Sequence, residues 1–248
     1  IIQNRVMCVF LSIRMDKAQI KKRFDATYVE EEFFGRKYIQ SAFEFSGWPV
    51  IPSDQPEKLV QMKWGLIPHW VRDEEGAKKI RANTVNARIE SVEEKPSFRS
   101  AVKNKRCLIL ANGFFEFHEL NKQKYPYYIQ LKKGVPFAIA GIFDEWTNRE
   151  SGEIVRSFSV LTTKANPLLE KIHNRKKRMP VILRPDLEKS WIGREIHPAD
   201  LKNQNIEHEM EAWPVSRLIT SREKERNSEE VIKRYHYPEL EMLNMLNL

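Results

Sequence analysis

The stretch RCLILANGFFEFHELNKQKYPYYIQLKKGVPFAIAGIF, residues 106–143, decides the fold class because it contains four strand-like runs in succession. Apolar and aromatic residues dominate each run, and Gly113 and Gly134 separate the runs in the manner of hairpins and bulges. The runs cover residues 106–111, 114–118, 125–131 and 137–143. This succession of runs predicts a largely antiparallel sheet.

Strands and short helices alternate irregularly on both sides of this stretch. We expect strands at residues 6–13, 59–64, 156–163 and 179–183, and helices at residues 16–24, 97–103, 167–172 and 185–192. Asp16 is a suitable N-cap for the first helix, whereas residues 30–58 are expected to be mixed, with Gly47, Pro49, Pro52 and Pro56 marking loop.

The order of these elements favours an α+β fold. It contains no βαβ period and no Gly-rich phosphate loop, so we expect largely antiparallel sheets that form an open barrel-like core flanked by short helices. With no linker and no internal repeat, the chain is expected to be a single domain. Its core covers about residues 7–220, and residues 221–248 form a charged, helix-prone tail.

The composition is that of a soluble globular protein, with 248 residues, 41% hydrophobic and 31% charged. The net charge of +8 suits a polyanionic partner such as a nucleic acid. Two cysteines, Cys8 and Cys107, are too few for a disulfide framework and fit a reducing compartment. Since no apolar run reaches about 18 residues and no secretory signal is recognised, we expect a cytoplasmic protein.

Met7-Cys8 opens the first apolar run, VMCVFLSI. If Met7 is the true start, its removal leaves Cys8 at the N-terminus, with a thiol and an α-amine on adjacent carbons. Because the α-amine has a pKa of about 7.7–8.0, an appreciable fraction is neutral near pH 7. The amine can then form an imine with an aldehyde, and the thiol can close a ring onto it. The alternative is a small buried residue in a strand, where free cysteines are common.

Residues 64–70, WGLIPHW, place Trp64, His69 and Trp70 around a proline turn. One interpretation is a stacking surface for unpaired bases, where each stacked base contributes about 1–3 kcal/mol. The other is an ordinary aromatic core closed by a turn. The local sequence leaves both open.

Residues 83–90, NTVNARIE, contain Asn86 and Arg88. The Asn86 amide can both donate and accept hydrogen bonds, and the Arg88 guanidinium presents a fork that suits phosphate. The alternative is a turn in which the asparagine satisfies backbone groups.

Residues 113–118, GFFEFH, place Glu116 among three phenylalanines. Burial in apolar surroundings raises the pKa of a carboxyl group, which suits it to proton transfer near neutral pH. In a strand, Glu116 shares a face with Phe114 and His118, whereas Phe115 and Phe117 share the other. The alternative is that Glu116 faces solvent.

Residues 172–180, IHNRKKRMP, place His173 before four basic residues. One interpretation is a general acid or base beside a phosphate-binding run, and the other is a solvated basic loop. The six histidines and two cysteines of the chain have no ligand-like spacing, so no metal site is expected.

In their order along the chain, these segments resemble the SOS-response-associated peptidase family, whose members process abasic sites in single-stranded DNA. No single segment is specific, whereas the ordered set extends over most of the chain, to about Leu183. The matching segments are MC at 7–8, WGLIP with a following Trp at 64–70, NARIE at 86–90, GFFE at 113–116, LTTKAN at 161–166 and H…RMPVIL at 173–183, with a weaker match in WPVS at 213–216.

The resemblance implies a role for each matching residue. Cys8 would be the nucleophile that forms a thiazolidine with the abasic aldehyde, and Asn86 would hold the terminal amine and the opened sugar. Glu116 and His173 would move the protons of ring opening, imine formation and ring closure. The DNA path would be lined by Pro52, Trp64, Trp70, Arg88, Arg175 and Arg178.

Three departures from the family pattern affect these roles. Val9-Phe10 stands where the family has Gly-Arg, so a phosphate contact is missing there, and Arg14 is the candidate substitute. The family motif His-x-Arg-Met-Pro is three residues longer here, which leaves open whether Arg175 or Arg178 takes the role of its arginine. Phe117 replaces the usual tryptophan after the glutamate.

The sequence therefore predicts a monomeric cytoplasmic protein, associated with the nucleoid during DNA damage, that binds single-stranded DNA and crosslinks to abasic sites without a cofactor. The family name implies a peptidase step, most simply removal of the residues before Cys8, and a lyase activity is conceivable. One rival is a non-covalent single-strand-binding module. The second rival is a conventional cysteine hydrolase that uses Cys8 or Cys107, although Cys107 lies within an apolar run and is expected in the core.

Overall fold

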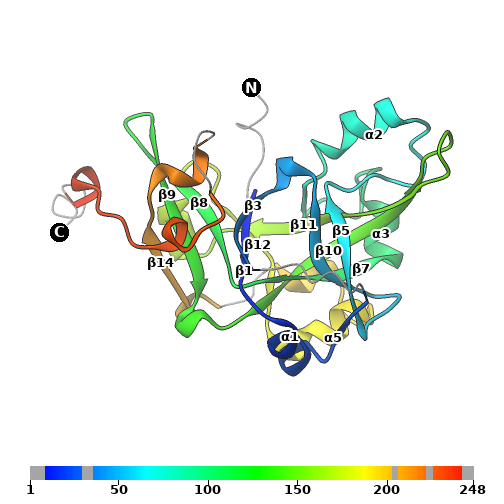
Figure 1. Cartoon of the computed structure of the whole chain (residues 1–248), viewed down its shortest axis with the longest axis horizontal. Coiled ribbons are helices and arrows are strands. Elements are labelled where there is room, and N and C mark those ends of the chain that lie inside the picture. Colours follow the sequence, from blue (N-terminus) through cyan, green and yellow to red (C-terminus); the bar gives the residue numbers. More distant parts are fainter. Residues whose placement is uncertain (1–8, 30–35, 203–205, 222–225, 242–248) are drawn as a thin grey trace.

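Two mainly antiparallel sheets form the molecule in the computed structural model, which describes residues 9–29, 36–202, 206–221 and 226–241 (Figure 1). The smaller sheet has five strands in the order β14-β9-β8-β1-β3. Strand β1 lies in its interior, paired with β3 on one side and with β8 on the other. The bounds are β1 (Phe10–Ile13), β3 (Lys37–Ser41), β8 (Gly113–Leu120), β9 (Gln123–Leu131) and β14 (Met210–Pro214).

The larger sheet contains a closed ring of strands. Its path runs β12-β11-β10-β7-β4-β5-β2, and β11 also pairs in parallel with β5, so that β4, β5, β7, β10 and β11 enclose a core. The bounds are β2 (Thr27–Tyr28), β4 (Gly47–Pro52), β5 (Lys58–Trp64), β6 (Asn86–Arg88), β7 (Arg106–Ala111), β10 (Phe137–Thr147), β11 (Ile154–Lys164), β12 (Arg178–Pro180) and β13 (Ile182–Leu183). The α+β class with a barrel-like core is confirmed, and the barrel is closed.

Large aromatic side chains fill the interior of the ring. Trp64 stacks on Phe158 with 5.7 Å between ring centroids, and Trp48 lies 6.3 Å from Trp64. Each indole N–H donates to a backbone carbonyl at 2.9 Å, Trp48 to Leu110 and Trp64 to Val85. Because their only polar groups are satisfied, both tryptophans can be fully buried without the cost of an unpaired donor.

Short α-helices pack against the sheets, and three of them begin where the sequence predicts, at residues 17, 167 and 185. Asp16 caps the first helix: its side chain accepts from the Gln19 backbone N–H at 2.8 Å, and the Gln19 side chain accepts from the Asp16 N–H at 3.0 Å. Asn166 caps α4 by accepting from the Leu169 N–H at 2.9 Å. The bounds are α1 (Lys17–Phe24), α2 (Glu74–Arg81), α3 (Arg99–Asn104), α4 (Pro167–Ile172) and α5 (Pro185–Ile192).

The expectation of loop at Gly47, Pro49 and Pro52 is wrong, because residues 47–52 form β4, which follows β3 and a short 3₁₀ turn. Two prolines in β4 obscure the strand. Pro49 pairs with Gln61 of β5 but precedes the register with β7, which starts at Val50, and Pro52 pairs with Cys107 of β7 beyond the register with β5. Each proline is therefore paired on one side only, which a sheet tolerates.

The C-terminal segment packs against the smaller sheet. Val231 and Ile232 are buried in a cluster with Phe115 and other residues of that sheet. Farther along, the Tyr237 hydroxyl donates to the Val215 carbonyl at 2.9 Å. No helix among the described residues is long and apolar enough to span a membrane.

Candidate active site

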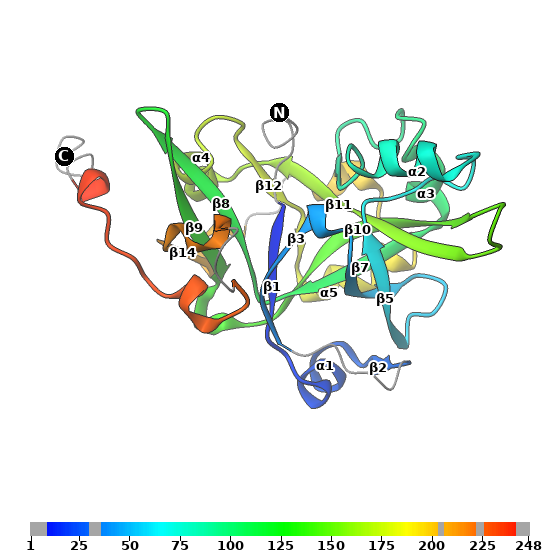
Figure 2. The same cartoon turned by 45° about the horizontal axis from the view of Figure 1, so that its top comes forward.

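A pocket of about 530 Å³ opens between the start of β1, strands β8 and β9, and the loop after α4. Figure 2 shows α4 beside β8 and β9, on the same side of β1. Aromatic side chains form one part of the lining and charged side chains the other. The lining residues are Val9, Phe10, Phe43, Phe115, Glu116, Phe117, Glu119, Lys124, Pro126, His173, Arg175, Lys176, Arg217 and Thr220.

Glu116 is a buried carboxyl group in this lining, with 4% of its surface exposed. The alternative that it faces solvent is therefore wrong. Strand alternation separates it from its neighbours: Phe115 belongs to the cluster around Phe10, and the Phe117 ring lies 6.1 Å from that of Phe10. The strand thus aims a single carboxyl group into an aromatic environment.

His173 reaches the same place from the end of α4. Its backbone N–H donates to the Leu169 carbonyl at 2.7 Å, and 8% of the residue is exposed. The imidazole Nδ1 lies 3.6 Å from Oε2 of Glu116 and 3.1 Å from the carbonyl oxygen of Arg178. The structure therefore brings together the two residues that the sequence proposes for proton transfer.

The contact with the Arg178 carbonyl fixes the tautomer of His173. A carbonyl oxygen only accepts, so the proton must be on Nδ1, which leaves Nε2 as the acceptor of the neutral ring. Burial lowers the pKa of His173; the hydrogen bond to Arg178 opposes this shift, and the charge of Lys176 adds to it. The ring is therefore mainly neutral at pH 7 and can act as a base.

Basic side chains form the charged part of the lining. Arg175 is 65% exposed at its side chain, and its Nη1 lies 3.0 Å from Oε2 of Glu119. Lys124, Lys176 and Arg217 line the pocket as well. This combination gives the mouth of the pocket a positive charge that suits a phosphate backbone.

Arg178, the other candidate from the basic run, has a different environment. It is 8% exposed, and its guanidinium donates to both carboxylate oxygens of Glu90 at 2.7 and 2.8 Å and to the Thr162 carbonyl at 2.6 Å. A guanidinium engaged in this way inside the protein has no surface for a phosphate. We therefore assign Arg178 to the framework, and Arg175 is the arginine of the run that reaches the pocket.

Asn86 stands at the start of β6, opposite Val160 of β11. Both polar atoms of its side chain are buried, and neither has a hydrogen-bond partner among the described residues. The alternative that Asn86 satisfies backbone groups is therefore wrong. A buried polar group without a hydrogen-bond partner destabilises the fold by about 1–3 kcal/mol. Such a group is typical of a functional site, where a ligand can supply the missing partner. Arg88, two positions along the same short strand, is exposed.

Trp64 and Pro52 are not available for DNA contact. Trp64 has no exposed surface and stacks inside the ring, and Pro52 is buried at the end of β4. We therefore assign both to the framework instead of the DNA path. Trp70, in contrast, is 49% exposed, so the base-stacking interpretation of WGLIPHW stays a prediction for Trp70, whereas Trp64 is an ordinary core residue.

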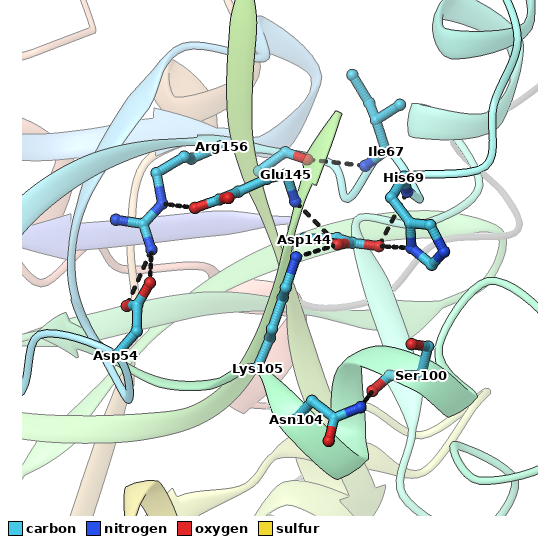
Figure 3. A network of polar contacts seen from close by, with 10 residues as sticks. Asp54, Ile67, His69, Ser100, Asn104, Lys105, Asp144, Glu145 and Arg156 are labelled. Carbon is cyan, nitrogen blue, oxygen red and sulfur yellow. Dashed lines mark hydrogen bonds and ion pairs between the residues drawn. The ribbon is translucent and has the colours of Figure 1, made fainter. Parts of the chain in front are cut away.

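A polar network fixes the turn that presents Trp70 (Figure 3). Asp144, 3% exposed, accepts from the backbone N–H of His69 and lies at 2.9 Å from its Nδ1. The ammonium of Lys105 reaches the other carboxylate oxygen at 2.8 Å. The Ile67 N–H donates to the Ser157 hydroxyl at 2.8 Å. These bonds hold both ends of the turn to the ring, so the exposed indole is presented from a rigid support.

Sequence reasoning missed several residues of the pocket. Phe43 lies in the 3₁₀ turn after β3, where Ser41 and Glu44 form a capping box, and that Ser-x-x-Glu pattern is the signal that could have located the turn. Lys176 was noted only as part of the basic run, and nothing local to the sequence brings Lys124 or Arg217 to the same pocket. Long-range strand pairing places them there.

Cys8 lies outside the described residues, so its predicted role stays a prediction. Val9, to which it is bonded, lines the pocket. Arg14, the candidate substitute for the missing phosphate contact, is partly buried and donates to the Tyr128 hydroxyl at 3.3 Å and to Oε1 of Gln130 at 3.2 Å. It does not line the pocket.

Comparison of the whole chain with known proteins finds relatives that share one name, abasic site processing protein. The chain is 38% identical over 189 residues to the abasic site processing protein YoqW of Bacillus subtilis, covering 74% of this chain and 80% of that protein. It is 35% identical over 153 residues to the abasic site processing protein HMCES of Xenopus tropicalis, covering 54% of this chain and 44% of that protein.

The fold is shared with proteins of known structure. A protein from Bacteroides thetaiotaomicron superimposes with a TM-score of 0.86 at 32% identity, covering 92% of this chain and all of the other. The family model described as SOS response associated peptidase matches residues 7–222, which include every residue assigned to the pocket. The chain therefore belongs to the SOS response associated peptidase (SRAP) family.

Proposed function

We propose that this protein binds single-stranded DNA and captures abasic sites covalently through Cys8. The observation that carries the proposal is the pocket in which Val9, the residue bonded to Cys8, lies with the buried pair of Glu116 and His173. The names of the relatives, abasic site processing proteins, support the same substrate.

The proposed chemistry needs a terminal amine, a thiol and groups that move protons. In the ring-opened form the abasic sugar is an aldehyde. The α-amine of Cys8 attacks the carbonyl carbon and water leaves to give an imine, and the thiol then adds to the imine carbon to close a thiazolidine. Both nucleophiles belong to one residue, so the second step is intramolecular and gains from proximity.

The described residues supply the proton transfers of this scheme. Neutral His173, with Nε2 as the acceptor, can take a proton from the attacking amine. Glu116, among aromatic side chains, can deliver a proton to the ring oxygen of the sugar or to the departing hydroxyl. The unpaired amide of Asn86 supports a role in holding the terminal amine and the opened sugar, because it can donate to the one and accept from the other.

The DNA path that we propose follows the exposed basic and aromatic residues. Arg88 and Arg175 contact phosphates, with Lys124 and Arg217 at the mouth of the pocket. Trp70 stacks on an unpaired base from its fixed turn. The active form that we propose is a monomer.

Incubation with an oligonucleotide that contains one abasic site, followed by denaturing electrophoresis, tests the proposal. The parent protein should give a heat-stable shifted band and Cys8→Ala should give none, while the matched control Cys107→Ala should crosslink like the parent. Intact mass should show that crosslinking protein begins at Cys8, since the peptidase step that we propose removes the residues before it. A heat-stable band from Cys8→Ala would refute the covalent role of Cys8.

The rival in which Cys107 is the nucleophile of a hydrolase is disfavoured by its environment. Cys107 has no exposed surface, and burial raises the pKa of its thiol well above the usual value. A thiol that is both inaccessible and protonated is a poor nucleophile. The non-covalent binding module is the outcome if abasic DNA is bound and no shifted band forms.

A further inference from the structure

Lys176 occupies a place in the pocket that the proposed mechanism does not use. The loop between His173 and Arg178 is closed by a hydrogen bond from the Lys177 N–H to the His173 carbonyl at 2.9 Å. Lys177 itself has a left-handed backbone, with φ of 49°, and its carbonyl accepts from the Ala165 N–H at 2.9 Å. This turn puts Arg175 and Lys176 in the pocket lining, whereas Lys177 does not line it.

The surroundings of Lys176 lower the pKa of its ammonium group. Burial lowers the pKa of its ammonium group, and the nearby charges of Lys124, Arg175 and Arg88 lower it further, whereas the charge of Glu116 raises it. Burial lowers the pKa because the ammonium ion loses hydration, and each nearby positive charge lowers it because like charges repel where solvent is partly excluded. A lysine in such a place is suited to nucleophilic chemistry, because only the neutral amine attacks a carbonyl.

A phosphate contact alone would not need a lysine here. Arg175, the adjacent pocket residue, already offers an exposed guanidinium that is always charged and presents a planar fork to phosphate. Lys176 differs from it in being half-buried beside Glu116 and His173, the two groups placed to move protons. A primary amine beside an acid and a base is the arrangement that condensation with an aldehyde requires.

We propose that Lys176 is a second amine of this site, which forms a reversible imine with the abasic aldehyde independently of Cys8. The inference rests on the proposed function in that it takes the same substrate. The Nζ lone pair attacks the carbonyl carbon, and His173 takes a proton from the nitrogen and passes it to the alkoxide oxygen, which gives a neutral carbinolamine. The carbinolamine hydroxyl then takes a proton from Glu116 and leaves as water, and the Glu116 carboxylate recovers a proton from the iminium nitrogen to leave the imine. Addition of water reverses the step, so there is no net redox change.

This imine has a different consequence from the thiazolidine. It keeps the sugar in its open form inside the pocket, yet it hydrolyses on denaturation, whereas the ring formed by Cys8 is stable to heat. The two adducts can therefore be distinguished in one sample by whether a reducing agent is needed to preserve them.

Reductive trapping with sodium cyanoborohydride tests the proposal, because it converts an imine into a stable secondary amine. The parent protein is incubated with abasic single-stranded DNA and the reductant, digested, and its adducts are located by mass spectrometry. We expect a sugar adduct on Lys176 that requires the reductant. The matched controls are Lys176→Arg, which keeps the charge and cannot form an imine, and Lys171→Ala, which removes an exposed lysine outside the pocket.

Lys176→Arg should lose the reductant-dependent adduct, and its yield is measured together with the affinity for undamaged single strands and the reductant-independent crosslink at Cys8. Lys171→Ala should behave like the parent in all three measurements. Trapping only at the terminal amine or at Lys124, or an unchanged yield from Lys176→Arg, would overturn the proposal. Because the heat-stable crosslink reports on Cys8 separately, failure of this inference is distinguishable from failure of the proposed function.

Discussion

Alanine at the two arginines of the basic run should affect different properties. Arg178→Ala should lower the stability of the fold, because Arg178 belongs to the framework, and Arg175→Ala should change DNA binding, because Arg175 lies at the pocket. Arg178→Ala removes four hydrogen bonds, two to the Glu90 carboxylate and two to the carbonyl and hydroxyl of Thr162. Breaking a buried ion pair costs about 3–5 kcal/mol. The Glu90 side chain is 33% exposed and can recover water, so we expect about 3 kcal/mol.

Arg175→Ala is the matched control. Its guanidinium is 65% exposed and makes a surface ion pair with Glu119, so its loss should change the free energy of unfolding by less than about 1 kcal/mol. Urea denaturation measures both variants, and only Arg178→Ala should lower the midpoint, with the m-value unchanged. In single-strand binding only Arg175→Ala should reduce the salt dependence. Equal stability of the two variants would refute the assignment.

The cost of Arg178→Ala should also depend on pH. Burial raises the pKa of Glu90, but the hydrogen bonds from Arg178 and from its own backbone, with the charges of Arg178 and Lys202, outweigh burial and bring the pKa below its usual value. A carboxyl with a lowered folded-state pKa stabilises the fold above its unfolded pKa, and this stability is lost as the pH falls through the folded value. The difference between parent and Arg178→Ala should therefore shrink below about pH 4. A difference that stays constant as the pH is lowered further, below about pH 4, would contradict the ion pair.

Three further predictions concern the pocket and the DNA path. Glu116→Gln and His173→Ala should each slow crosslinking by about 10²–10⁴-fold without weakening binding to undamaged single strands, and equal rates for all three proteins would make both residues structural. Because the pKa of His173 is lowered, the ratio of the parent rate to the His173→Ala rate should stay constant from pH 7 down to the ordinary pKa of 6.5 and shrink only below it. Arg88→Ala should reduce the slope of log affinity against log salt by about 0.7, as measured by fluorescence anisotropy, and an unchanged slope would remove Arg88 from the DNA path. Trp70→Ala should weaken single-strand binding by about 1–3 kcal/mol with little change in stability, whereas Trp64→Ala should destabilise the fold by about 3–5 kcal/mol in urea, and the reverse result would contradict their assigned places.

The parts of the fold that the sequence predicts well are those with local causes. Helix α4 coincides with the expected residues because Asn166 and Pro167 define its start. Strand β7 coincides because a short unbroken apolar run is typical of a buried strand. Strand β4 could not be predicted, because its prolines are acceptable only through the one-sided pairing that neighbouring strands provide. Helix α2 is a different case. Gly76 interrupts its otherwise helical pattern, although it lies in the first turn, where the Asp73 side chain caps the helix.

The candidate site divides in the same way. Glu116 and His173 stand out locally as polar groups in apolar or basic runs, and the structure places them 3.6 Å apart. The local sequence does not show which side chains are buried. Trp64 and Trp70 belong to one short motif, yet one is in the core and the other on the surface. Arg178 looks like its basic neighbours until its partner Glu90, far away in the chain, is known.

The interior position of β1 has a mechanical consequence. A DNA strand attached just before Val9 would transmit any tension, from a helicase or from a stalled replication fork, directly into this strand. Strand β1 is hydrogen-bonded on both sides, with Leu11 opposite Gln40 of β3 and Phe114 of β8. A pull along β1 therefore loads both ladders in shear, so that bonds on both sides must yield together, whereas a strand at the edge of the sheet would have only one ladder to resist the force. The attachment point of the proposed adduct is thus built to bear load.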